Sequence, residues 1–427
     1  MKGVPTIIER FAKSKETVDT IYLFFLHGAN YLIPLITTPY LMKVLGASGY
    51  GLIGFSFSLI LYFTLFVDFV FNMSATKRIA SDPSKLNVIF TSVFVAKTLL
   101  LSIALLFIPI IINIDNIAEY KYAVLSFIPL LIGNTYTFFW LFQGVGKVRV
   151  ISILNTVSKV MILPLTFVFV RQPEDIYIAI LIQSMVFVCS CLISNIYIVK
   201  NKVVRFAKVT LSDVKAEFEE GYPLFLSSAA TSLYTQLFTI ILGFTATSSV
   251  VGCYSACERI VRTLFQTFYT PISLSFFPRL SSLAAMSRTD ALALFSKLRH
   301  IISLFMLFII LAIFVSADMI ADFLGKDYQD MNTIIRMMSV ALIAIALGAY
   351  YGQMGLVALG DSKSKKDFSK VYFIVAPISL GVMYALSSIW GIYGTTFSLI
   401  CTEFSVFILM FVYYKRNNKR LDTYVKN

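Results

Sequence analysis

Charged and catalytically versatile side chains are scarce in this sequence. Only 14% of its 427 residues are charged, and it contains two histidines, two tryptophans and five cysteines. Hydrophobic residues make up 58%, which exceeds the share found in ordinary soluble domains. The composition therefore excludes an ordinary soluble domain and indicates a chain whose main solvent is lipid.

Several familiar motifs are also missing. The cysteines (Cys189, Cys191, Cys253, Cys257 and Cys401) fall inside apolar runs, without the spacing of a disulfide framework or of a His/Cys metal site. No Walker motif is present, so direct use of ATP is not expected. Residues 1–20 mix acids and bases, and we expect no cleavable signal peptide there. We therefore expect no metal and no organic cofactor.

Long apolar runs dominate what is present. A bilayer core of about 30 Å needs roughly 20 apolar residues per helix. Such runs predict an all-α polytopic membrane protein of about twelve transmembrane helices, near residues 21–42, 51–76, 87–113, 121–142, 151–170, 176–199, 222–244, 249–278, 300–317, 332–359, 371–388 and 392–414.

The basic residues are placed on one side of these runs. Of the 36 lysines and arginines, 27 lie in the terminal segments and in every second loop. The remaining loops hold only Lys43, Lys121, Arg171 and Lys326. Because basic residues accumulate in cytoplasmic loops, both termini are predicted to be cytoplasmic and the number of helices even. The formal charge of +13 thus reports topology, and nucleic-acid binding is not expected.

The sequence also indicates two related halves. Gly46 and Gly49 lie where the first run meets the second, and Gly243 and Gly252 lie where the seventh meets the eighth, six helices later. An offset of six helices predicts parallel repeats that enclose a central cavity. The predicted domains are an N-terminal lobe (1–199), a cytoplasmic linker (200–221) that contains a short surface helix, and a C-terminal lobe (222–427). Glycine turns recur in many helical membrane proteins, which leaves unrelated halves as the alternative.

Charged residues inside the predicted helices are candidates for a functional site. A charge at the bilayer centre costs at least about 2.5–3.5 kcal/mol, so each needs a partner, a wet cavity or a route to the interface. Arg336 lies close enough to a helix end to reach the headgroups. The other basic residues, predicted to bind substrate in the cavity, are Arg262, Arg259, Lys159 and Lys97. Their excess over the acids suits an anionic headgroup, because arginine and lysine donate charge-assisted hydrogen bonds to phosphate.

The acidic and polar residues of the helices form a second set. Asp68, Glu403, Glu258, His27, Asn30 and Asn72 are predicted to line the cavity or to carry a coupling ion. Two alternatives stay open. Glu258 and Arg262, four residues apart, also fit an intrahelical ion pair, and polar stripes at helical spacing also occur as contacts between helices.

The order of short motifs resembles the bacterial O-antigen flippases over nearly the whole chain. The motifs are Asn30-Tyr31-Leu32-Ile33-Pro34-Leu35, Pro39-Tyr40-Leu41, Leu45-Gly46 through Gly49-Tyr50-Gly51, Phe66-Val67-Asp68-Phe69, Phe71-Asn72-Met73-Ser74-Ala75-Thr76, Gly133-Asn134, Trp140-Leu141-Phe142-Gln143-Gly144 and Thr402-Glu403. The resemblance implies membership of the multidrug, oligosaccharidyl-lipid and polysaccharide exporter superfamily, with alternating access between two six-helix lobes.

The same resemblance implies a substrate and a mechanism. The substrate would be an undecaprenyl-diphosphate-linked repeat unit, which crosses from the cytoplasmic to the periplasmic leaflet of the bacterial inner membrane. Cavity arginines and ion-coupled acids of related flippases carry over to Arg259, Arg262, Asp68 and Glu403. A proton or sodium gradient would supply the driving force. Expected partners are the lipid-linked oligosaccharide, membrane lipid, a polysaccharide polymerase and a chain-length regulator.

Two other functions fit the sequence less well. A multidrug exporter of the same superfamily would favour cationic substrates and an acid-rich cavity, which the basic excess opposes. A membrane-embedded polysaccharide polymerase would need catalytic groups on a sizeable outer loop, whereas the predicted outer loops are short. The sequence therefore favours a transporter over an enzyme.

Overall fold

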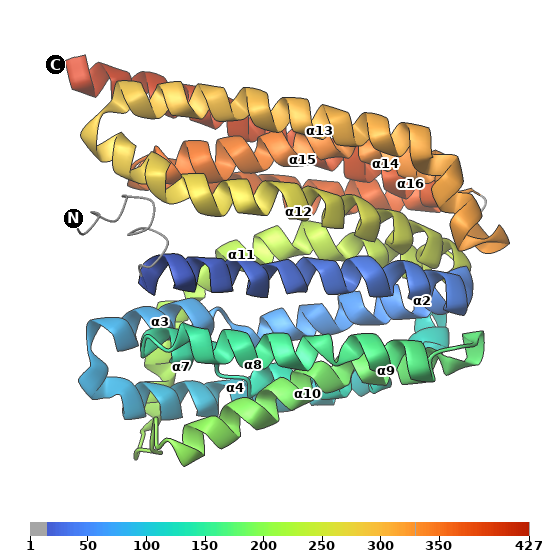
Figure 1. The fold of residues 1–427 in the computed structure, drawn as a ribbon, viewed down its shortest axis with the longest axis horizontal. Helices are drawn as coiled ribbons and strands as arrows, with labels where there is room; N and C mark the ends of the chain where they lie inside the picture. The colour runs from blue at the N-terminus through green and yellow to red at the C-terminus, as the bar shows by residue number, and fades with distance from the viewer. Residues whose placement is uncertain (1–14, 329, 427) are drawn as a thin grey trace, which may run out of the picture. The chain divides into compact units, whose positions relative to one another are not determined.

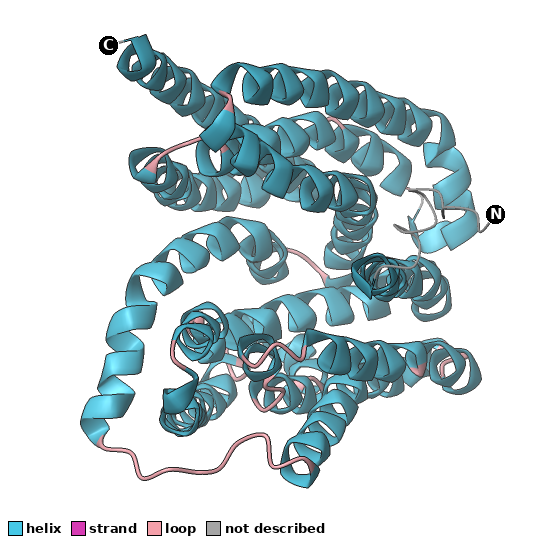
Figure 2. Ribbon diagram, turned by 60° about the vertical axis from the view of Figure 1, so that its left-hand side comes forward, coloured by secondary structure: helices cyan, strands magenta, loops and turns pink. Residues whose placement is uncertain are grey.

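The computed structural model describes the backbone of residues 15–328 and 330–426. It describes side chains from residue 33 onward, except Leu35, Val148, residues 421–427 and most positions from 223 to 236. Within this part of the chain every regular element is helical and none is a strand (Figure 2). The predicted all-α class is therefore confirmed.

The first half of the chain forms helices that begin with one long, interrupted helix. Its main elements are α2 (Lys15–Asp68), α3 (Phe71–Ser81), α4 (Leu86–Ile111), α5 (Lys121–Ser126), α6 (Ile128–Thr135), α7 (Phe139–Gly144), α8 (Val148–Val160), α9 (Ile162–Phe169) and α10 (Ile176–Lys200). Short 3₁₀ turns connect some of them, at Pro83–Lys85, Asp115–Tyr120 and Pro173–Asp175.

The second half contains longer helices (Figure 1). They are α11 (Leu211–Thr245), α12 (Ser248–Met286), α13 (Arg288–Leu324), α14 (Met331–Ser339), α15 (Ala341–Ala349), the π-helical segment η5 (Tyr350–Ala358) and α16 (Ser362–Lys426). A 3₁₀ turn, Lys326–Tyr328, precedes α14.

Glycines interrupt the two longest helices. The φ angle is 68° at Gly46 in α2 and 54° at Gly391 in α16, a left-handed region that glycine enters without steric cost. α2 has 54 residues and α16 has 65, so each is more than twice the length that a bilayer core requires. Each interruption lies between two predicted spans, which explains how one element can contain both.

Seven helices of the described chain are long and apolar enough to cross a membrane. The number rises to eight if the bent pair Asp115–Ser126 and Ile128–Gly144, which meet at 49°, counts as one span. These helices confirm a multi-pass membrane protein. The total of twelve and the arrangement in two lobes remain predictions.

α13 illustrates why these helices need lipid around them. One face is buried and carries Ile302, Met306 and Ile313 at helical spacing. The opposite face exposes equally apolar side chains, among them Leu304 (72% exposed) and Val315 (86%). A helix that is apolar all round has no face for water. Its exposed side is therefore the surface that contacts lipid.

The chain divides into two compact units. Unit 1 comprises residues 1–44, 63–112 and 122–225, and unit 2 comprises 45–62, 113–121 and 226–427. In unit 1, α10 packs on α6, α8 and α9, and α3 packs on α7. In unit 2, α13 contacts α12 and α15, and α15 contacts α16 (Figure 1). Unit 2 thus contains two short pieces from the first half of the chain.

The predicted linker is anchored to unit 1. The backbone amides of Arg205 and Ala207 donate hydrogen bonds to Asn87 and Thr91 of α4, at 2.9 and 3.0 Å. The expected short surface helix is present, but it is the first part of α11 and continues into the seventh predicted span. Arg78 of α3 pairs with Glu217 and Glu220 of this segment.

Candidate functional site

Two buried polar clusters contain most of the ionisable residues predicted inside the membrane. The first, called here the balanced pair, consists of Asp68, Lys97 and Asn72 in unit 1. The second, called the acidic triad, consists of Glu258, Arg262 and Glu403 in unit 2.

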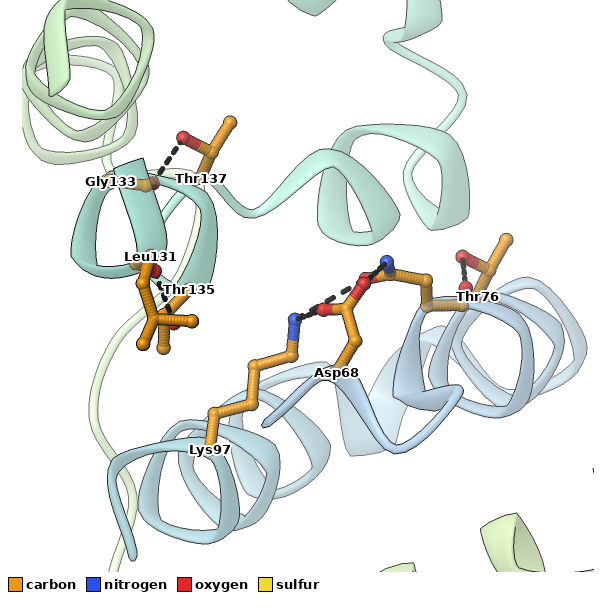
Figure 3. A network of polar contacts seen from close by, with 8 residues as sticks. Asp68, Thr76, Lys97, Leu131, Gly133, Thr135 and Thr137 are labelled. Atoms are coloured by element: carbon orange, nitrogen blue, oxygen red, sulfur yellow. Dashed lines mark hydrogen bonds and ion pairs between the residues drawn. The ribbon is translucent and has the colours of Figure 1, made fainter. Parts of the chain in front are cut away.

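The balanced pair joins three helices. The Lys97 Nζ on α4 lies 2.5 Å from Oδ1 of Asp68, the last residue of α2 (Figure 3). Asn72 on α3 donates to Asp68 Oδ2 at 2.7 Å, and its own oxygen lies 3.4 Å from Lys97 Nζ. Lys97 is 1% exposed. One acid and one base therefore neutralise each other, with an amide bridging them.

An interruption between helices α2 and α3 sets the position of Asp68. The next two residues, Phe69 and Val70, have φ angles of 41° and 58°. Bulky and β-branched residues rarely adopt this left-handed region. The predicted continuous span 51–76 is therefore divided here, because α2 ends at Asp68 and α3 begins at Phe71. The break places Asp68 and Asn72 on separate helices while their side chains remain in contact.

The acidic triad surrounds one guanidinium group. Arg262 Nε donates to Glu258 Oε1, one turn earlier on α12, at 2.8 Å. Arg262 Nη2 lies 3.8 Å from Glu403 Oε1 on α16. Thr239 on α11 donates to the other oxygen of Glu258 at 3.2 Å. The intrahelical ion pair that the sequence allowed is present, and a second carboxylate joins it from a residue far along the chain.

The two carboxylates of the triad are well buried. The side chains of Glu258 and Glu403 are 12% and 4% exposed, while that of Arg262 is 25% exposed. The cluster therefore contains two carboxyl groups and one guanidinium group. Its guanidinium is the most accessible of the three groups.

Tyr254 is a member of this site that sequence reasoning missed. It is completely buried on α12, one turn before Glu258, and interacts electrostatically with all three members of the triad. Its hydroxyl has no hydrogen-bond partner within the described structure. The spacing of Tyr254, Glu258 and Arg262 at four-residue intervals was the signal that could have identified it.

The remaining predicted site residues lie elsewhere. Arg259 is exposed on α12 and interacts electrostatically with Tyr50, while Lys159 is half-buried near the end of α8 in unit 1. His27 and Asn30 lie outside the described side chains. Arg336 pairs with Asp318 at 2.7 Å. The roles predicted for these residues, and those of the two clusters, remain predictions.

A metal site is not a feature of the described residues. No group of three or more histidine, cysteine, aspartate or glutamate side chains there could hold a metal ion. The triad contributes only two such side chains, with Arg262 between them. The triad therefore consists of a partly accessible guanidinium between two buried carboxyl groups.

Solved structures of membrane transporters share this fold. The lipid II flippase MurJ in an inward closed conformation superimposes with a TM-score of 0.67 over 92% of this chain and 86% of its own, at 16% identity. An inward-facing multidrug resistance MATE transporter of the MOP superfamily gives a TM-score of 0.65 over 93% and 99%, at 14% identity. The fold is therefore that of this class of multi-helix membrane transporters.

Sequence relatives define the family more closely. Residues 17–284 match the family described as "Polysaccharide biosynthesis protein", and this chain belongs to that family. A protein of Escherichia coli (strain K12), named as an O-antigen transporter, is 32% identical over 94% of this chain and 97% of its own length. A protein of Shigella dysenteriae with the same name is 28% identical over 92% and 98%. The predicted resemblance is thus confirmed.

Proposed function

We propose that this protein is a flippase for lipid-linked oligosaccharides, and specifically for undecaprenyl-diphosphate-linked O-antigen repeat units. It moves them from the cytoplasmic to the periplasmic leaflet of the bacterial inner membrane, with both of its own termini in the cytoplasm. It acts as a transporter rather than an enzyme, and delivers repeat units to a polysaccharide polymerase and a chain-length regulator. The names of the relatives, the family and the buried charges support this proposal.

The single observation that carries the proposal is Arg262, a partly accessible guanidinium within an apolar helical unit. A guanidinium can donate two parallel hydrogen bonds to a phosphate, and such bonds are strong where little water competes. The contact to Glu403, at 3.8 Å, is longer than a normal hydrogen bond and is the easier one to replace. A diphosphate can take that place without breaking the 2.8 Å contact between Arg262 and Glu258.

The charges of the two clusters support ion coupling. The balanced pair needs no further charge, whereas the acidic triad would hold one excess negative charge in a buried place if both of its acids were ionised. Burying an uncompensated charge is costly, so a proton or a sodium ion accompanies the triad when no substrate is bound. An anionic headgroup bound at Arg262 increases the negative charge of the acidic triad. Binding of the coupling ion and binding of the headgroup therefore depend on each other.

The experiment that tests the proposal is complementation of a strain that lacks its own O-antigen flippase. Arg262→Ala is expected to abolish surface O-antigen while the variant is expressed and inserted at the normal level. Arg336→Ala is the matched control, because it removes an arginine that pairs with the 60%-exposed Asp318 rather than with the triad. Full activity of Arg262→Ala, or equal loss in both variants, would contradict a role for Arg262 in substrate binding.

A further inference from the structure

A short connection between α4 and α5 belongs to a different unit from the helices that flank it. Residues 113–121, called here the outer strap, cluster with unit 2, while residues 63–112 and 122–225 belong to unit 1. Residues 45–62 of α2 also belong to unit 2. Each of these two segments lies at a loop that is poor in basic residues. The positive-inside rule places such loops on the outer side of the membrane.

Beneath the strap, α2 and α12 approach each other backbone to backbone. A Cβ atom added at Gly51 would lie 1.8 Å from the carbonyl oxygen of Ser248, and one added at Gly252 would lie 1.8 Å from that of Ala47. Neither distance is possible between real atoms. Glycine is therefore required at both positions for this crossing to form, which we call the glycine crossing.

Hydrogen bonds connect the strap to this crossing. Ser48 and Ser248 lie on either side of it, with their hydroxyl oxygens 2.8 Å apart. Ser248 also donates to Oε1 of Glu119 in the strap, at 2.6 Å. The chain of contacts thus runs from α2 through the first residue of α12 to the strap.

Aromatic packing adds an apolar contact between the strap and α2. The ring of Tyr120 stacks on Phe55, with centroids 4.0 Å apart, and both residues are almost completely buried. Phe55 in turn lies against α11, because a Cβ at Gly243 would be 2.2 Å from its ring. Ile117 of the strap is 1% exposed. The strap is therefore packed onto these helices rather than projecting from them.

We propose that the outer strap is a latch that holds the glycine crossing together and must leave it before substrate exits on the outer side. This inference rests on the proposed transport function. A contact between two backbones without intervening side chains cannot loosen gradually, because small shifts already lose its close packing. Its opening requires the strap contacts of Glu119 and Tyr120 to break as well.

The test tethers the strap to α12 through a reversible covalent link. Glu119→Cys and Ser248→Cys are combined and joined by a short bis-methanethiosulfonate reagent, and the product is identified by mass spectrometry. Transport of lipid-linked oligosaccharide is expected to fall to the level measured in membranes that lack the protein. It should return after the cross-link is cleaved by a reducing agent. Each single cysteine variant, treated in the same way, controls for reaction of the native cysteines.

A tether confined to the strap supplies the matched control. The side chains of Asn113 and Lys121 already form a hydrogen bond of 3.1 Å, so Asn113→Cys and Lys121→Cys can be joined without linking the strap to α12. Transport is expected to continue with this tether. Continued transport with the 119–248 tether, or failure of that tether to form, would overturn the latch.

A second measurement does not depend on the substrate. Ser255 lies behind the crossing, where a Cβ at Gly54 would be 2.5 Å from its hydroxyl oxygen. In a Ser255→Cys variant, labelling by a membrane-impermeant maleimide added outside should increase when Tyr120→Ala weakens the strap. Unchanged labelling would contradict the latch. If labelling increases but no variant transports lipid-linked oligosaccharide, the proposed function fails while the latch stands.

Discussion

The balanced pair and the acidic triad solve the same physical problem differently. Both place ionised side chains in an apolar environment, where each charge needs a partner. The pair matches Asp68 with Lys97 and adds Asn72 as a bridging amide. The triad surrounds Arg262 with two acids, one of them 3.8 Å away. The balanced pair balances its charges without any further group, whereas the acidic triad balances its charges only with an additional ligand.

This difference separates a structural role from a binding role. A neutral, short-range pair connecting α2, α3 and α4 fixes the positions of three helices. A cluster with more acids than bases, a partly accessible guanidinium and a Tyr254 hydroxyl that has no hydrogen-bond partner among the described residues can exchange ligands. Variants of the pair should therefore change stability, and variants of the triad should change transport.

The largest effect is expected from removing one partner of the balanced pair. Lys97→Met leaves Asp68 without its counter-charge and should destabilise the protein by about 3–5 kcal/mol. The double variant Asp68→Asn, Lys97→Met removes both charges and should recover most of that loss. Thermal unfolding of the purified protein in detergent measures both. Equal stability of Lys97→Met and the unmodified protein would contradict the structural role of the balanced pair.

A smaller effect is expected from keeping the charge of Arg262 and changing its shape. Arg262→Lys retains one positive charge but loses the planar fork, so transport should fall by about tenfold to a hundredfold, the equivalent of one charge-assisted hydrogen bond. The variant should unfold at the same temperature as the unmodified protein. Normal transport by Arg262→Lys would show that only charge matters at this position.

Ion coupling should distinguish the two clusters directly. Glu403→Gln removes the excess charge of the triad, so transport should become less dependent on the proton or sodium gradient. Asp68→Asn is the comparison in the balanced pair and should keep that dependence. Transport into vesicles with imposed gradients measures both. If Asp68→Asn alone removed the dependence, coupling would belong to the balanced pair.

The smallest effect concerns a third acid–base contact, outside the membrane-spanning segments. Burial raises the pKa of Glu217 from its ordinary value of 4.5 to about 7, although Arg78 acts in the opposite direction. Glu219, like Glu217, lies on the first part of α11, but is largely exposed. Glu217 therefore takes up a proton more readily when this segment is docked than when it is free.

The sign of the pH effect follows from that raised pKa. Between pH 4.5 and about 7 the docked segment binds more protons than the undocked one, so docking weakens as the pH rises through this window. Amide exchange of residues 211–221, corrected for intrinsic rates, should increase by up to about tenfold per pH unit there. Glu217→Gln should remove this dependence, and Glu219→Gln should retain it. A pH-independent exchange rate would contradict the assignment.

The sequence predicted features that depend on local pattern. Long apolar runs identified the helices, and the four-residue spacing of Glu258 and Arg262 identified their ion pair. The contacts of Glu403 with Arg262, and of Lys97 with Asp68, join different helices and follow from packing that no local pattern specifies. The break at Phe69 and Val70 contradicts the local preferences of both residues, and only tertiary contacts can impose it.

The two left-handed residues that follow α2 limit how this part of the chain can be engineered. Each costs roughly 1–2 kcal/mol relative to a right-handed conformation, and glycine avoids this cost. Val70 is only 8% exposed, so Val70→Gly would also remove a buried side chain whose burial contributes about 1.5–3 kcal/mol. The melting temperature of Val70→Gly should therefore stay the same or fall, because the side chain that carries the strain also anchors the start of α3 in the core.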